Sequence, residues 1–180
     1  MHDTEDRQYW FELGLQKEHA FVTQLAPMLG LDLQINPAKV GNPKAIDFVS
    51  GAAGEPALPA DLKTQNTPFS TAGRMGKNPG RTVTFNLKDL LHYERLYPQA
   101  VIFFHVHWTT LSQSFGGQTY TVPPLNGVWQ ASVKQLRALV DQDDTQHAYQ
   151  RRVNDTQGNA KASYLLSLDD LTLVGLLDGA

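Results

Sequence analysis

The segment Ala100–Val106 constrains the fold of this chain more than any other. Its sequence, Ala-Val-Ile-Phe-Phe-His-Val, is almost entirely apolar. Such a run predicts a strand that is covered on both faces, because a strand with one solvated face alternates apolar and polar residues. Strands of that kind lie in sheets that carry helices on their faces. We therefore expect an α/β protein.

The elements expected around this strand complete a mixed sheet. Apolar residues at alternating spacings of four and three, with Glu18 among them, predict an amphipathic helix over about 4–29. We then expect strands at 31–35, 45–49 and 61–65, a helix at 87–94, the strand at 100–106, a helix at 128–140, a strand at 163–166 and a helix at 168–177. A three-strand meander, a crossover helix and a buried strand give a mixed central sheet flanked by helices, in a single domain over 1–180.

The composition narrows the class of protein. Hydrophobic residues make up 41% of the 180 residues and charged residues 18%, as in ordinary globular domains. Cysteine is absent, which excludes disulfides, thiolate zinc sites and cysteine nucleophiles. The chain has no apolar run of the roughly 18 residues that span a bilayer, and its acidic start is unlike a signal peptide. We expect a cytoplasmic protein without a membrane partner.

Positive charge gathers in one segment, although the formal net charge is -3. Between Lys63 and Arg81 the chain carries four basic residues and no acidic one. A local basic loop can bind phosphates even in an acidic protein. We expect Arg74, Lys77 and Arg81 to contact the backbone of a nucleic acid. Arg151, Arg152 and Lys161 form either a second basic patch or ordinary surface.

Acidic residues fall on three of the expected elements. Glu18 occupies an inward position of the first helix, where an unpaired charge is costly. Asp47 lies on the second strand, on the face opposite its apolar neighbours. Asp61, Lys63 and Gln65 alternate along the third strand and so share one face. If the second and third strands form a hairpin, these charges converge.

Such a cluster suits the hydrolysis of phosphodiesters. Magnesium and other hard divalent cations prefer carboxylate oxygens, which Glu18, Asp47 and Asp61 would supply. The bound metal would polarise the phosphate and activate a water. The ammonium of Lys63 would orient that water or stabilise the developing charge.

The chain here resembles the PD-(D/E)xK nuclease superfamily, over roughly residues 10 to 110. The family carries an acid on a helix, an aspartate on a strand, and Asp/Glu-x-Lys on the next strand; here these are Glu18, Ile46-Asp47 and Asp61-Leu62-Lys63. Gln65 stands where many members have a glutamine. The usual proline is replaced by Ile46, and the third acid is Asp rather than the more frequent Glu.

This resemblance implies a restriction endonuclease-like fold and an active site of Glu18, Asp47, Asp61, Lys63 and Gln65. The three acids would bind Mg²⁺ or Mn²⁺, and the substrate would be DNA. We expect a restriction-like endonuclease, because loop and C-terminal segments can supply base contacts. Cleavage of a duplex by one small site usually requires two subunits, so we expect a homodimer.

Other interpretations of the same residues remain open. A junction-resolving nuclease fits the size equally, and a non-catalytic DNA-binding or assembly protein can share the fold. His105 and His107 have the spacing of metal ligands and would make a zinc hydrolase the third option. The acids and Lys63 can also be solvated faces of a helix and a strand.

Overall fold

The structure, a computed structural model, describes residues 7–42, 44–51, 56–115, 117–142, 146–147 and 163–177. The chain divides into two compact units, Met1–Leu62 and Lys63–Ala180. The fold is of the expected α/β class, with a mixed six-stranded sheet. A single nuclease-like domain over 1–180 stays a prediction.

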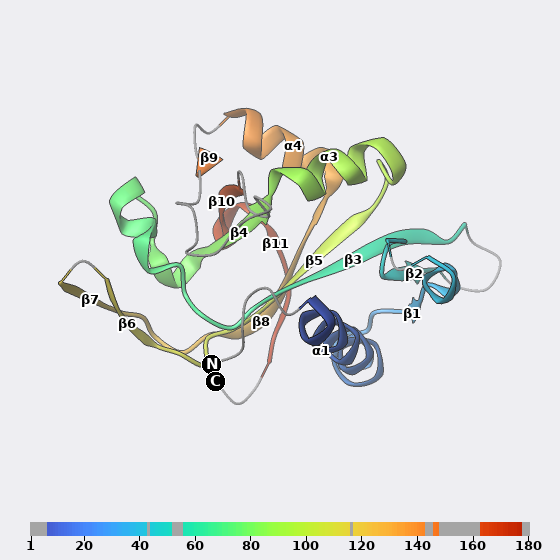
Figure 1. The fold of residues 1–180 in the computed structure, drawn as a ribbon, viewed down its shortest axis with the longest axis horizontal. Helices are drawn as coiled ribbons and strands as arrows, with labels where there is room; N and C mark the ends of the chain where they lie inside the picture. Colours follow the sequence, from blue (N-terminus) through green and yellow to red (C-terminus); the bar gives the residue numbers. More distant parts are fainter. Residues whose placement is uncertain are drawn as a thin grey trace. The chain divides into compact units, whose positions relative to one another are not determined.

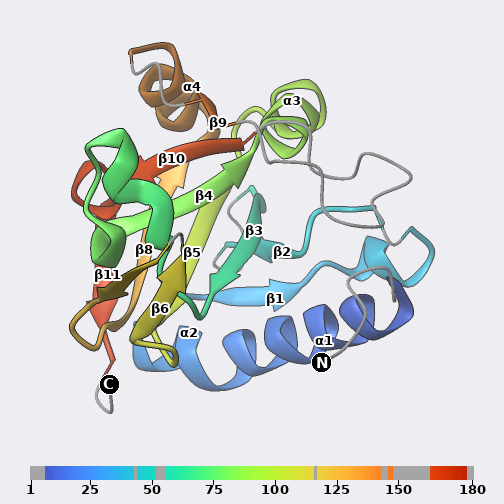
Figure 2. The same ribbon diagram turned by 60° about the vertical axis from the view of Figure 1, so that its left-hand side comes forward.

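The first unit opens with a helical segment of three parts. These are α1 (Arg7–Ala20), a π-helical turn η1 (Phe21–Leu25) and α2 (Ala26–Met28). The helix expected over 4–29 is therefore confirmed for 7–28, while residues 4–6 lie outside the described residues. Figure 2 shows this segment running alongside the first strand.

The face that this helical segment buries differs from the expected one. Phe11 and Leu15, expected to point inward, are 44% and 39% exposed. Phe21 and Ala26 are buried instead, and the ring of Phe21 stacks on that of Phe48 with centroids 5.8 Å apart. The π turn lengthens the helical repeat after Ala20, so the residues that follow it no longer keep the spacing of four and three.

Three antiparallel strands complete the first unit. They are β1 (Leu33–Ile35), β2 (Phe48–Ser50) and β3 (Leu58–Gln65), in that order across the sheet. β3 begins three residues earlier than expected, and its last three residues belong to the second unit. The meander expected from the sequence is confirmed.

The second unit continues from β3 through three longer strands. Their order is β3, β5 (Val101–His107), β8 (Asn126–Ser132) and β11 (Thr172–Leu176). The buried strand expected near 100–106 is confirmed, with Ile102, Phe103, Phe104 and Val106 at most 4% exposed. β8 lies between β5 and β11 and is antiparallel to both.

Of two expected helices in this region, that at 128–140 is confirmed only from Val133 onward, and that at 168–177 is wrong. Residues 128–132 belong to β8, and only Val133–Gln142 form the helix α4. Residues 168–170 form a short 3-10 turn, and residues 172–176 of the expected last helix form β11. Backbone pairing of β8 with strands on both sides decides its conformation, and tertiary pairing of this kind overrides a local helical pattern.

Helices α3 (Leu87–Leu96) and α4 lie side by side in Figure 1. An ion pair joins them, because the guanidinium of Arg137 on α4 donates to both carboxylate oxygens of Glu94 on α3, each at 2.7 Å. The crossover helix expected before Pro98 is thus confirmed and extends to Leu96.

Smaller sheets fill the remainder of the second unit. The strand expected near 163–166 is confirmed as β10 (Ser163–Ser167), which lies between β4 (Thr82–Asn86) and β9 (Gln146–His147). A separate two-stranded sheet pairs β6 (Ser112–Phe115) with β7 (Gln118–Thr121). The segment 66–80, between β3 and β4, contains the 3-10 turn η3 (Ser70–Met75) and the first residues of η4 (Pro79–Arg81). The indole of Trp108 donates to the Gly80 carbonyl at 3.0 Å and holds the end of this loop. Among the described helices, none is long and apolar enough to cross a membrane.

Candidate active site

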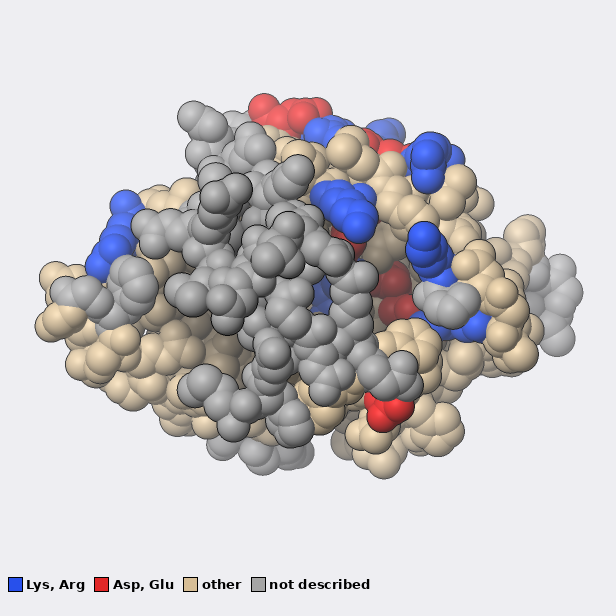
Figure 3. Space-filling view, in the orientation of Figure 1, with Lys and Arg blue, Asp and Glu red and all other residues tan. Residues whose placement is uncertain are grey.

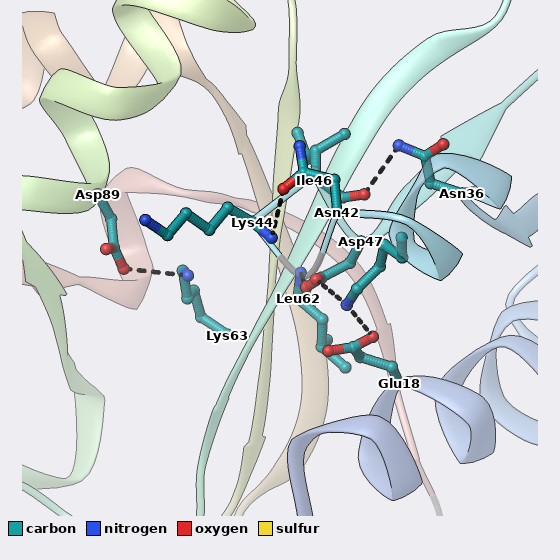
Figure 4. Close-up of polar contacts among 10 residues, drawn as sticks. Glu18, Asn36, Asn42, Lys44, Ile46, Asp47, Leu62, Lys63 and Asp89 are labelled. Carbon is teal, nitrogen blue, oxygen red and sulfur yellow. Dashed lines mark hydrogen bonds and ion pairs between the residues drawn. The ribbon is translucent and has the colours of Figure 1, made fainter. Parts of the chain in front are cut away.

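Glu18 and Asp47 meet at one cation, the ammonium of Lys39. The Nζ atom of Lys39 lies 2.6 Å from Oδ1 of Asp47 and also hydrogen-bonds to Oε2 of Glu18. The side chain of Lys39 is 9% exposed, that of Asp47 15% and that of Glu18 14%. Figure 4 shows the carboxylates of Glu18, from α1, and Asp47, from the residue before β2, pointing to the same place. Glu18 and Asp47 thus share one partner, while a common site that also includes Asp61 and Lys63 stays a prediction.

The turn between β1 and β2 places Lys39. This turn is the 3-10 helix η2 (Pro37–Val40), and its cap is Asn36, whose side chain accepts from the Ala38 amide at 3.0 Å. The Asn36 amide nitrogen donates to the Ile46 carbonyl at 3.0 Å, and its backbone N–H donates to the Asp47 carbonyl at 2.9 Å. These bonds hold the turn against the residues that precede β2, so that Lys39 reaches Asp47.

Asp47 is also held from β3. Its second oxygen, Oδ2, accepts the backbone N–H of Leu62 at 3.3 Å. Asp47 was expected within a strand over 45–49, but β2 begins at Phe48, since Ala45 instead closes a turn by donating to the Asn42 carbonyl. Phe48 pairs with Ala60, so the next step of this register brings Asp47 toward Asp61, which is 5% exposed.

The charge on Lys39 is stabilised by its partners. Burial lowers the pKa of the Lys39 amine, but hydrogen bonds and charge attraction from Asp47 and Glu18 outweigh it and raise the pKa above its ordinary value. The amine is therefore an ammonium at neutral pH. It can offer positive charge to the carboxylates but cannot itself coordinate a metal.

Three carboxylates do not form a ready metal cage here. Among the described residues, no group of three or more His, Asp or Glu side chains is arranged to hold a metal ion. Glu18 and Asp47 are brought together with an ammonium between them. The carboxylates of Glu18 and Asp47 supply the oxygen ligands that magnesium or manganese prefers. Their negative charge is concentrated at the position that Nζ of Lys39 occupies.

Lys63 and Gln65 occupy alternate positions on β3, as expected. The Lys63 ammonium lies 3.1 Å from Oδ2 of Asp89 at the start of α3 and 5.4 Å from the centre of the Tyr93 ring. Its side chain is 29% exposed. Lys63 is thus half-buried and placed by two residues of one helix.

Gln65 bonds to the backbone of the following segment. Its Nε2 donates to the carbonyls of Thr67 and Thr82 at 3.0 and 3.4 Å, and its Oε1 accepts the backbone N–H of Thr84 at 3.1 Å. These bonds fasten β3 to β4 and to the start of the loop between them. They give Gln65 a positioning role in this structure.

The three expected phosphate contacts differ in their surroundings. Arg81 pairs with Asp169, with Nε at 3.1 Å from Oδ1, and its guanidinium lies 5.6 Å from the Trp129 ring. Arg74, on η3, is exposed, and Lys77 is half-buried. On the face in Figure 3, lysine and arginine side chains stand in separate groups with acidic side chains near several of them. Arg151, Arg152 and Lys161 lie outside the described residues.

His105 and His107 share one side of β5, with ring centres 6.5 Å apart. Nε2 of His105 lies 3.4 Å from Oδ1 of Asn126 on β8. In the part of the chain that the structure describes, no third metal-ligating side chain joins them. A zinc site on this pair therefore gains no support from the geometry.

The residue that sequence reasoning missed is Lys39. It lies in a turn, outside any helical or strand periodicity, so the hydrophobic pattern gives it no face. The pairing of β1 with β2 and the bonds of Asn36 together bring Lys39 beside Asp47. No protein-family model, curated protein or solved structure matches this chain, so the arrangement has to be interpreted from its own chemistry.

Proposed function

We propose that this protein is a metal-dependent DNA endonuclease of the restriction-like, PD-(D/E)xK type. The observation that carries the proposal is the convergence of Glu18 and Asp47 on a single buried cation. The order of acids along the chain supports it, with Glu18 on a helix, Asp47 before one strand and Asp61-Leu62-Lys63 on the next. A buried ion cluster is weak evidence for a purely structural role, since replacing one by apolar residues is often neutral or stabilising.

The chemistry of the acids fits a divalent cation. An ammonium already occupies the place between Glu18 and Asp47, so this pair of carboxylates attracts and holds positive charge. Although no three described acids are already arranged as a cage, we propose that Glu18, Asp47 and Asp61 would supply carboxylate oxygens to Mg²⁺ or Mn²⁺, with water completing the coordination. When bound, the ion would supply Lewis-acid polarisation of the phosphate and a more acidic water.

The remaining roles fall to side chains of the chain itself. Lys63 would place its ammonium toward the reacting phosphate and stabilise the charge that develops there. Asp89 and Tyr93 would orient Lys63, from 3.1 and 5.4 Å. Arg74 and Lys77 would bind flanking phosphates without reading sequence. Two copies of the chain would cut the two strands of a duplex, each copy acting on one strand.

The occupied acid pair favours a second candidate, a non-catalytic DNA-binding protein on the same fold. If Lys39 is a permanent partner of Glu18 and Asp47, those acids are structural and no metal enters. This candidate keeps the DNA contacts and loses the chemistry. A junction-resolving nuclease differs from the first candidate only in the shape of its DNA.

One assay separates these candidates. Plasmid, linear and four-way branched DNA are incubated with the protein, with and without Mg²⁺, beside Asp61→Asn, Lys63→Ala and the control Lys44→Ala, an exposed lysine. We expect magnesium-dependent cuts with the wild type and the control, and a loss of at least about a hundredfold in both site variants. Cleavage of branched DNA alone indicates a junction-resolving enzyme. Binding of DNA without cleavage, or full activity in either site variant, refutes the proposed endonuclease.

A further inference from the structure

The charges around Lys39 do not balance. Two carboxylates, Glu18 and Asp47, share one ammonium, and all three side chains are at least 85% buried by exposed area. These three described side chains by themselves therefore carry one net negative charge in a mostly buried place. Such an excess is unfavourable unless another cation can relieve it.

The way in which Lys39 is held allows its side chain to leave. Its backbone is fixed in η2 by the bond from its N–H to the Asn36 carbonyl, at 3.0 Å. Its neighbour Val40 is 95% exposed, so the turn is at the surface. A lysine side chain has four rotatable bonds, and its ammonium is strongly hydrated in water. Lys39 can thus swing outward while the turn stays in place.

We propose that Lys39 is a built-in substitute for the metal: its ammonium neutralises Glu18 and Asp47 when no metal is bound, and a divalent cation displaces it. The inference rests on the proposed function, because it takes Glu18 and Asp47 to be metal ligands. The inference adds that metal binding at this site is regulated, since the metal has to compete with the ammonium of Lys39.

The competition has a measurable consequence for metal affinity. A ligand that binds only the minor, open state has its apparent affinity reduced by the fraction of that state. If the ammonium is withdrawn about 1 to 10% of the time, metal binding is weakened about tenfold to a hundredfold. Removing the ammonium should recover that factor, while an exposed lysine nearby should have no such effect.

The first experiment follows Lys39 in the wild-type protein. Lysines are labelled by brief reductive methylation and quantified by mass spectrometry, with and without Mn²⁺. We expect labelling of Lys39 to rise about tenfold when Mn²⁺ is added, because the ammonium leaves its partners, while labelling of exposed Lys44 stays constant. Labelling of Lys39 that does not respond to Mn²⁺ overturns the inference. No variant has to fold for this test.

The second experiment measures Mn²⁺ binding by calorimetry in the wild type, Lys39→Met and the control Lys44→Met. We expect Lys39→Met to bind at least about tenfold more tightly than the other two proteins. Equal or weaker binding by Lys39→Met overturns the inference, even if the wild type cuts DNA. Conversely, displacement of Lys39 by Mn²⁺ in a protein that cuts no DNA supports the inference and refutes the proposed endonuclease.

Discussion

The two units of this protein each contain a cation shared by two acids, in very different surroundings. In the first unit, Lys39 contacts Glu18 and Asp47, and the three side chains are 9–15% exposed. In the second, Arg137 contacts Glu94 and Asp141, and the side chains are 30–62% exposed. The stoichiometry is the same, so the two sites differ mainly in their access to solvent.

This difference in solvent access separates the Arg137 cluster, a structural ion pair, from the Lys39 cluster, which needs another explanation. Water screens the Arg137 cluster, so its excess charge has little consequence, and its bidentate geometry joins α3 to α4. The Lys39 cluster has lost most of its water, so its excess charge is unfavourable. This excess charge supports the proposal that Glu18 and Asp47 bind a further cation, and the following experiments test whether the two clusters differ in this way.

The largest expected effect is that of Lys39→Met. This change removes the ammonium and leaves two mostly buried carboxylates side by side, which should destabilise the protein by roughly 3 kcal/mol. The measurement is urea unfolding in metal-free buffer at neutral pH. Lys44→Met, at an exposed position of the same unit, should stay within about 0.5 kcal/mol of the wild type. If Lys39→Met loses no more stability than Lys44→Met, the Lys39 cluster is no different from the solvent-screened Arg137 cluster.

Neutralising one acid should restore part of this loss. In Glu18→Gln/Lys39→Met the repulsion between Glu18 and Asp47 is gone, so we expect the double variant to be about 1–2 kcal/mol more stable than Lys39→Met alone. The same unfolding experiment measures it. Additive effects of the two substitutions would show that the carboxylates do not interact, contrary to their shared contact with Lys39.

The sequence predicts the core of the fold where local pattern and tertiary environment agree. The apolar run that became β5 needs no partner to be recognised as a buried strand. Residues 128–132 fail this condition, because Val128, Trp129 and Ala131 are apolar on a pattern that suits a helix as well as a strand. Pairing with β5 and β11 decides between them, and pairing over such distances is not visible in a local window.

The candidate site was predictable only in part. Glu18 lies on α1 as expected, but Asp47 lies just before β2 instead of within the expected strand, and the helical segment buries a different face from the expected one. Lys39 stands in a turn whose conformation depends on Asn36 and on the residues before β2. The pairing of Lys39 with the two acids depends on the fold, so no sequence motif predicts this pairing.

Cations that serve DNA binding should differ from both clusters in their response to salt. Arg74→Ala/Lys77→Ala should lower DNA affinity for all sequences and reduce the slope of log affinity against log salt by about two, one unit for each phosphate contact. Arg81→Ala should change the slope by less than one unit, because a phosphate would have to displace Asp169 from its guanidinium. Fluorescence anisotropy at several salt concentrations measures both slopes. An unchanged slope in the double variant would remove Arg74 and Lys77 from the DNA interface.

The smallest expected effect is that of Glu94→Gln, which tests whether the Arg137 cluster is only a screened ion pair. The hydrogen bonds from Arg137 lower the pKa of Glu94 below its ordinary value, although burial opposes them. A lowered pKa in the folded state stabilises the protein above the ordinary pKa of a glutamate, and this contribution disappears as the pH falls through the lowered value.

At neutral pH we expect Glu94→Gln to lose about 1 kcal/mol of stability or less, because the side chains of Glu94 and Arg137 are both about one-third exposed. Urea unfolding across a pH series should show the wild type and Glu94→Gln converging below about pH 4, and Asp141→Asn, which removes only a 3.4 Å contact, should resemble the wild type throughout. A loss as large as that of Lys39→Met, or one that persists in acid, would mean that exposure does not distinguish the two clusters.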